Sequence, residues 1–330
     1  MLTSRRAVLA AGLLAGGCLA TTEAPRPGSA GTPLAPMRLT GPLRNLGGFE
    51  IDNARLGAGG LSGLHLDDDL LATMIDDRGR WAQARIVLRD GQAEALEPVA
   101  SGPLGDGAGQ PLPPGHAGDA EALARLPDGT WLVGFERWHR IRAYRRLDGA
   151  GTYVEAPPGL DRSPFNAGLE SLGVLADGRL LAISEGLAPD GAPALRSAWI
   201  GGPGRWDRLA WRPAPGLVPV DAAGLPDGGA LVLERGFSWL GGFTGRLVSV
   251  PADAIRAAAA DTVLEGEEIL RFDGSTVPAE NYEGVAAVRH GGRTLVAIVA
   301  DDNHSPLQRS LLLLFELRAP AIAAPLAVRA

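Results

Sequence analysis

Acidic residues recur at the ends of strand-like segments in this chain, and their spacing would let them meet as pairs of carboxylates. In the segment 119–136 (DAEALARLPDGTWLVGFE), two short apolar runs flank Asp128-Gly129, a strong β-hairpin signal. A two-residue hairpin about this dipeptide predicts Glu121 opposite Glu136. Two close carboxylates can hold a hard cation, or one of them can keep a proton and act as an acid near neutral pH.

The same pattern occurs four more times along the chain. Residues 168–185 (GLESLGVLADGRLLAISE) predict Glu170 opposite Glu185, and residues 282–302 predict Glu283 close to Asp301. Weaker copies begin near residues 62 and 220. The period is about 50 to 60 residues, which is typical of a repeat architecture.

Each repeat also contains a second hairpin-like segment after the first, so that four strands are expected per repeat. Four strands per repeat indicate an all-β fold, a β-propeller, and the high content of 46 Gly and 26 Pro agrees with many short strands. Five blades account for the whole pattern, whereas six would require one degenerate repeat inside a long interval. The last repeat has three strands, so residues 37–56 are expected to supply its fourth strand and close the ring.

This topology predicts that the acidic residues lie around one opening, because the first strand of each blade begins, and the second ends, at the same face. Like charges facing each other in a sheet are destabilising. A cation, neighbouring arginines such as Arg78, Arg137 and Arg235, or a retained proton would have to offset them. Asp77, Asp221 and Glu234 are expected at the same opening.

Composition excludes several functions. The formal net charge of −7 argues against a nucleic-acid partner. All 31 basic residues are arginine, so a P-loop lysine and a Schiff-base lysine are absent. The sequence also lacks the HExxH, CxxC and EF-hand motifs.

The N-terminus reads as a targeting segment. Arg5-Arg6 precede a short apolar run, so residues 1–20 are expected to be an export signal of the twin-arginine or lipoprotein type. Cys18 is the single cysteine and is the residue that a lipid anchor would modify. Residues 21–36 have the composition of a flexible tether, and residues 37–330 are expected to form one domain.

Several segments together carry a family resemblance. They are GGLSGL, DAEAL, GLESL, FERWHRIRAY, NYEGVA and the closing DDNHSPLQRSLLLLFEL. On the basis of these segments, residues 46–317 resemble the bacterial phytase-like family, which is named for the esterase-like activity of phytase. The resemblance implies an exported, propeller-like domain that hydrolyses phosphoesters or related esters. The candidate residues that it implies are Glu121, Glu170, Glu283, Asp301 and Asp302.

The leading hypothesis is therefore a Ca²⁺-assisted hydrolase of phosphate esters. Its expected calcium ligands are Glu121, Glu170 and Glu283. Arg137 or Arg235 would neutralise charge on the phosphoryl group, and Glu136 or Glu185 would be the general base.

Two alternatives fit the same residues, namely a Ca²⁺-dependent, lactonase-like esterase and a non-catalytic binding propeller of the cell envelope. The expected partner is a small-molecule ester or phosphoester. The expected location is the periplasm or the membrane surface, with lipidated Cys18 as the tether.

Overall fold

The Asp-Gly turns of the repeats lie at hairpin tips in the computed structural model, which describes residues 26–113 and 115–318. In the first such turn, Leu126 N donates to the Thr130 carbonyl at 2.8 Å and closes the loop. Gly129 N donates to the Leu126 carbonyl at 2.9 Å, and its φ of +85° is a conformation that glycine adopts without steric cost. The loop therefore has three residues, one more than the sequence prediction assumed.

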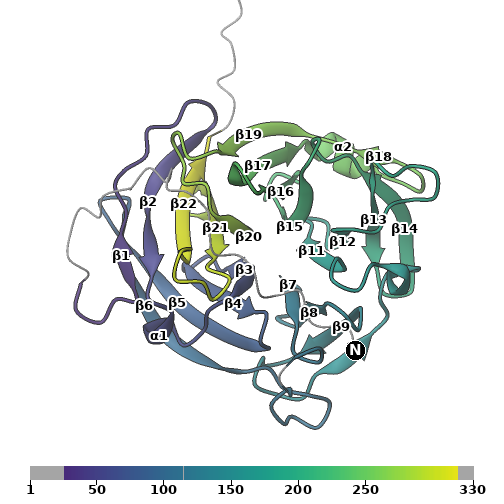
Figure 1. Cartoon of the computed structure of the whole chain (residues 1–330), viewed down its shortest axis with the longest axis horizontal. Coiled ribbons are helices and arrows are strands. Elements are labelled where there is room, and N and C mark those ends of the chain that lie inside the picture. The colour runs from purple at the N-terminus through teal and green to yellow at the C-terminus, as the bar shows by residue number, and fades with distance from the viewer. Residues whose placement is uncertain (1–25, 114, 319–330) are drawn as a thin grey trace, which may run out of the picture.

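Five sheets form a ring around a central opening, and the first strand of each repeat is the innermost strand (Figure 1). Three of the sheets have the four antiparallel strands of a propeller blade. They are β3 (Leu61–Leu66), β4 (Leu71–Asp76), β5 (Arg80–Arg89) and β6 (Gln92–Pro103); β7 (Ala120–Arg125), β8 (Trp131–Phe135), β9 (Arg140–Tyr144) and β10 (Thr152–Val154); and β15 (Val218–Gly224), β16 (Ala230–Ser238), β17 (Gly242–Val250) and β19 (Glu267–Phe272). The predicted β-propeller is confirmed with five blades, and the described residues contain no sixth sheet.

The third blade has an additional edge strand. Its strands are β11 (Leu169–Val174), β12 (Leu180–Ser184), β13 (Arg196–Gly202), β14 (Arg205–Trp211) and β18 (Val263–Leu264). β18 follows the short helix α2 (Ala252–Ala257) and pairs in parallel with β14, so the chain returns from the fourth blade to the edge of the third. A 3-10 helix, η1 (Leu160–Arg162), precedes this blade.

The fifth blade closes the ring, as the sequence predicted. It contains β20 (Asn281–His290), β21 (Arg293–Asp301), β22 (Leu311–Leu317), β2 (Leu43–Ile51) and β1 (Gly31–Pro33). β2 pairs antiparallel with β22, so that a segment from the N-terminal part of the chain lies beside the last strand (Figure 1). A one-turn helix, α1 (Asn53–Leu56), connects β2 to the first blade.

β1 lies inside the segment that its composition assigned to a flexible tether. Gly31 pairs with Ile51 in β2, Ala30 N donates to the Leu96 carbonyl at 2.7 Å, and Ala30 is fully buried. The folded part therefore begins before Met37, because these backbone groups find partners in the fifth and first blades. The expected export signal, including Cys18, lies outside the described residues.

Apolar clusters between neighbouring blades hold the ring together. Ile75 of the first blade packs with Leu123 and Val133 of the second, and each is at most 3% exposed. Burying an aliphatic side chain of this size contributes roughly 1.5–3 kcal/mol. The ring thereby forms a rigid scaffold for the loops at its two faces. None of the helices in the described residues is long and apolar enough to cross a bilayer.

Candidate functional site

The innermost strand of every blade carries a β-bulge near its beginning, always at the same place in the repeat. A bulge inserts one extra residue opposite the partner strand and changes the direction of its side chain, and bulges are frequent beside active sites. The extra residues are Ser62, Glu121, Glu170, Val220 and Glu283. These five positions coincide with the starts of the repeats found in the sequence.

The predicted pairing of carboxylates across the hairpins is wrong by two positions. Glu136 N donates to the Asp119 carbonyl at 2.9 Å, so that Asp119, and not Glu121, lies opposite Glu136. Glu185 similarly lies opposite Gly168. The three-residue loop shifts the register by one residue and the bulge shifts it by another. Asp119 is thus a site residue that the sequence reasoning missed, although it could have been found by allowing for a longer loop and a bulge.

The second strands end at the same face, and we call the carboxylates gathered there the acidic mouth. Four blades place an acid at this end, whereas the fourth blade has Arg235 at the corresponding position. The acidic mouth comprises Asp77, Asp119, Glu121, Glu136, Glu170, Glu185, Glu283 and Asp301. Besides burial, Glu283 contributes to the raised pKa of Glu121, and Glu121 contributes to the raised pKa of Glu170, so charges from three blades act on one another.

Within the acidic mouth, two groups of three carboxylates approach closely enough to share a metal ion. One oxygen from each of Glu136, Glu170 and Glu185 lies within 4.8 Å of the other two. Asp119 and Glu121 form an equivalent group with Glu136. Glu136 belongs to both groups and is only 6% exposed, so it is the central carboxylate of the site.

The carboxylates of the acidic mouth have unusually high proton affinities. Burial raises the pKa of Glu136 to about 7, and the negative charges of Asp119 and Glu185 contribute to the rise. Burial, together with Asp119 and Glu136, raises the pKa of Glu121 well above its usual value. Burial and Glu185 do the same for the pKa of Glu170. Neither Glu121, Glu136 nor Glu170 forms an ion pair with any described residue.

Two arginines neutralise part of this charge. The Arg235 guanidinium donates to Glu283, to Glu185 Oε1 at 3.2 Å and to Asn281 Oδ1 at 2.7 Å. Arg137 Nε lies 2.6 Å from Asp119 Oδ2, and Asp119 is the only described residue with which Arg137 forms an ion pair. The two arginines therefore lie at the acidic mouth, as the sequence predicted, but they leave its central carboxylates unneutralised.

Three acids that were expected at the opening have other positions. Asp302 Oδ2 accepts a hydrogen bond from Asn53 Nδ2 at 2.9 Å, and Asp302 belongs to neither group of converging carboxylates. Glu234 points to the opposite side of β16 from Arg235 and pairs with Arg246 at 2.6 Å. Asp221 is buried between β15 and β20 and accepts a hydrogen bond from Val285 N at 2.7 Å.

The high pKa values predict that the metal-free protein loses stability as the pH rises from 5 to 8. Burial raises the pKa of Glu136, Glu283 and Asp301 to about 7, whereas in an unfolded chain such groups titrate near pH 4. The folded state therefore binds more protons in this window, and the stability contributed by the protonated groups is lost as the pH passes 7. Thermal unfolding in EDTA at constant ionic strength should show a falling melting temperature, and Glu136→Gln should reduce the fall. A melting temperature that rises through this window would contradict the prediction.

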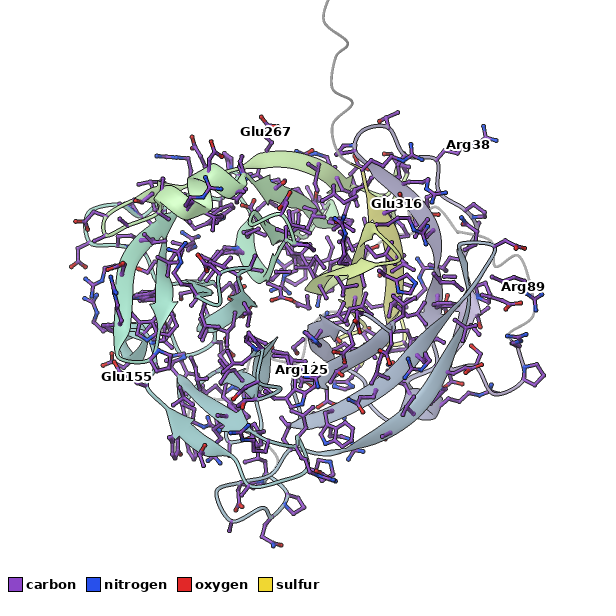
Figure 2. The ribbon with its side chains drawn as sticks, turned by 180° about the vertical axis from the view of Figure 1, so that it is seen from behind. Arg38, Arg89, Arg125, Glu155, Glu267 and Glu316 are labelled. Carbon is purple, nitrogen blue, oxygen red and sulfur yellow. The ribbon has the colours of Figure 1, made fainter. Side chains whose placement is uncertain are left out.

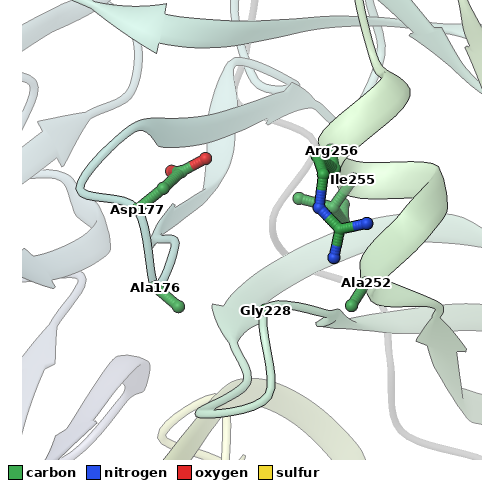
Figure 3. A pocket seen from close by; sticks show the side chains of 6 residues that line it. All are labelled: Ala176, Asp177, Gly228, Ala252, Ile255 and Arg256. Carbon is green, nitrogen blue, oxygen red and sulfur yellow. The ribbon is translucent and has the colours of Figure 1, made fainter.

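Several other charged side chains lie at the outer edge of the blades. Figure 2 shows Arg38, Arg89, Glu155 and Glu267 at the periphery of the ring. At the face that carries the hairpin turns, a pocket of about 230 Å³ lies between two of these turns and α2 (Figure 3). Asp177, the one carboxylate that lines this pocket, forms an ion pair with Arg179 at 2.8 Å. This pocket therefore contains none of the converging carboxylates.

Comparison with known proteins identifies the family. Residues 57–304 match the family described as Phytase-like, esterase-like activity of phytase, and no curated protein matches the chain. The PQQ-bound aldose sugar dehydrogenase from Streptomyces coelicolor has a similar fold, with 14% identity and a TM-score of 0.47 over 85% of this chain and 99% of that chain. A gluconolactonase from Xanthomonas campestris is 11% identical, with a TM-score of 0.42 over 78% of this chain and 73% of that chain. Because the family match covers well over half of the chain and includes the whole acidic mouth, the protein belongs to the phytase-like family.

Proposed function

We propose that the acidic mouth is the active site of a hydrolase that cleaves phosphate esters with the help of a bound Ca²⁺. The observation that carries the proposal is the approach of Glu136, Glu170 and Glu185 to within 4.8 Å of one another. Like charges at this spacing in a buried place are unfavourable unless a cation or protons offset them. The family description, esterase-like activity of phytase, supports a hydrolase.

The donor atoms of both groups fit a hard cation. All five residues of the two groups are carboxylates, with no histidine or cysteine among them. Oxygen ligands of this kind suit Ca²⁺, whereas softer metals prefer nitrogen or sulfur. Glu136, Glu170 and Glu185 would hold the ion. When bound, it would polarise a phosphoryl oxygen and orient the attacking water.

Glu121 would accept a proton in the reaction, and Arg137 would bind the substrate. Glu121 lies beside Glu136 and outside the proposed ligand group, so one of its carboxylate oxygens would accept the proton of the attacking water. Arg137 directly follows Glu136 in the chain, and its guanidinium would bind the phosphoryl oxygens. Its Nε lies 2.6 Å from Asp119 Oδ2 and donates to Asn166 Oδ1 at 3.3 Å. This arrangement exchanges the roles expected from sequence, in which Glu121 was a ligand and Glu136 or Glu185 the base.

Calcium titration tests the cation site directly. After EDTA treatment at pH 8, added Ca²⁺ should raise the melting temperature of the protein, because an ion that binds only the folded state stabilises by roughly 2.7 kcal/mol at 100 times its dissociation constant. The Glu136→Gln/Glu170→Gln double variant should lose this response. Differential scanning calorimetry gives the shift.

Glu267→Gln is the matched control, because Glu267 is an exposed acid on β19 at the periphery (Figure 2). It should respond to Ca²⁺ as the parent does. Absence of a calcium response in the parent would remove the cation site from the proposal. A calcium response without hydrolysis of phenyl phosphate would direct the search to lactones and carboxylic esters, and absence of all these activities would favour a binding role.

A further inference from the structure

A cleft of about 660 Å³ lies beside the acidic mouth. Its walls come from α1, the turn between β4 and β5, and the loop between β21 and β22. All three segments lie at the face where the second strands end. Asp77 of the acidic mouth directly precedes Arg78 of the cleft wall, and its Oδ1 lies 3.1 Å from Nε2 of His304, which also lines the cleft. The cleft is therefore the immediate neighbour of the acidic mouth.

The acidic side chains of the cleft already have hydrogen-bond donors. Asp76 Oδ1 accepts from Arg78 N at 3.0 Å and from Arg80 N at 2.8 Å, and Asp76 is 1% exposed. Asp302 accepts from Asn53 Nδ2 at 2.9 Å and from His304 N at 3.1 Å. These carboxylates shape the cleft walls, and their oxygens already accept hydrogen bonds from groups of the protein.

The two arginines of the cleft are not occupied in this way. Arg78 is exposed, and its guanidinium forms no ion pair or hydrogen bond with any described residue. Arg80 donates only Nε, to the Gly57 carbonyl at 3.2 Å, and likewise forms no ion pair among the described residues. Gly79 between them has a φ of +72° and lies against Gly118, so this turn holds both arginines at the cleft wall.

We infer that this cleft binds a second anionic group of the substrate, a carboxylate or a phosphate, through Arg78 and Arg80. The inference rests on the proposed function, since the ester itself would lie in the acidic mouth. Guanidinium groups bind both kinds of oxyanion through two parallel hydrogen bonds. The preferred substrates are therefore phosphate esters whose alcohol part carries a further negative charge.

Phenyl phosphate and 4-carboxyphenyl phosphate form a matched pair for the test, because they differ by one carboxylate. The parent protein with Ca²⁺ should have a KM roughly tenfold lower for the carboxylated ester, as expected for one charge-assisted contact. Arg78→Gln should abolish this preference and leave kcat and KM for phenyl phosphate within about twofold. Arg80→Gln should reduce the preference. Arg89→Gln, an exposed arginine of the same blade, should leave it unchanged.

The outcomes separate this inference from the proposed function. Equal KM values in the parent, or a preference that survives in Arg78→Gln, would overturn the role of the cleft while hydrolysis stands. If the parent hydrolyses neither ester, the proposed function fails. Calorimetric binding of phenylphosphonate and 4-carboxyphenylphosphonate would then test whether the cleft binds the second anionic group. An Arg78-dependent advantage of the carboxylated phosphonate would support the cleft, and its absence would refute it.

Discussion

Glu136→Gln is expected to lower kcat/KM for phenyl phosphate by roughly 100-fold or more while raising the melting temperature of the metal-free protein at pH 8. The loss of activity follows because Glu136 belongs to both groups of converging carboxylates. The variant removes one calcium ligand and also the charge beside Glu121, the proposed base, and proton transfer alone typically contributes 10²–10⁴-fold. Steady-state kinetics at saturating Ca²⁺ would measure the effect.

The expected gain in stability comes from the removal of a buried negative charge. Above pH 7 the folded protein must hold an ionised Glu136 that is 6% exposed, close to Asp119 and Glu185. A neutral glutamine of the same shape keeps the hydrogen bond from Gly168 N, which lies 3.3 Å from Glu136 Oε1, and removes the repulsion. Stability and activity should therefore change in opposite directions. A variant that is less stable in EDTA and still fully active would assign Glu136 a structural role and contradict the proposed site.

Those features of the fold that depend on local sequence could be predicted. The Asp-Gly turns and the period of the repeats follow from patterns that recur within one chain, and the pairing of β2 with β22 follows because the last repeat has only three strands of its own. The face at which Glu121, Glu170 and Glu283 gather also follows, because propeller topology fixes where the innermost strands begin. The family resemblance agreed with these patterns, and the match over residues 57–304 confirms it.

Features that depend on a single inserted residue could not be predicted. A three-residue loop and a two-residue loop can contain the same Asp-Gly dipeptide, and the bulge at Glu121 has no signal of its own in one sequence. Each changes the register by one residue, and in a strand such a shift moves a side chain to the opposite face. This is why Asp119 was missed and why Glu234 was expected at the opening.

β1 was missed for a different reason. The residues around Gly31 are small or proline and have no apolar alternation, so their composition indicates a tether. Their order comes from distant partners, since Ala30 N bonds to Leu96 of the first blade and Gly31 pairs with Ile51 of the fifth. Contacts of this kind are visible only in the folded chain.

Glu234→Gln is expected to destabilise the protein by about 3–5 kcal/mol, the usual effect of removing one partner from a buried ion pair. Glu234 is fully buried and accepts from Trp211 Nε1 at 2.8 Å, Ala214 N at 3.1 Å and Arg246 Nε at 2.6 Å. The glutamine amide has only one oxygen and cannot replace both carboxylate oxygens as acceptors, and the Arg246 guanidinium, whose side chain is 15% exposed, would lose its counter-charge. Urea denaturation at pH 7 would measure the change in the free energy of unfolding.

This prediction depends on the side of β16 on which the Glu234 side chain lies, and its neighbour Arg235 lies on the other side. Arg235 faces the acidic mouth and Glu234 faces away from it, although the two residues are adjacent in the chain. Glu234→Gln should therefore leave the stabilisation by Ca²⁺ unchanged, whereas Glu136→Gln should weaken it without a comparable loss of stability. A loss below about 1 kcal/mol for Glu234→Gln would mean that water replaces the lost contacts. A lost calcium response would instead place Glu234 at the opening, against the register of β15 and β16.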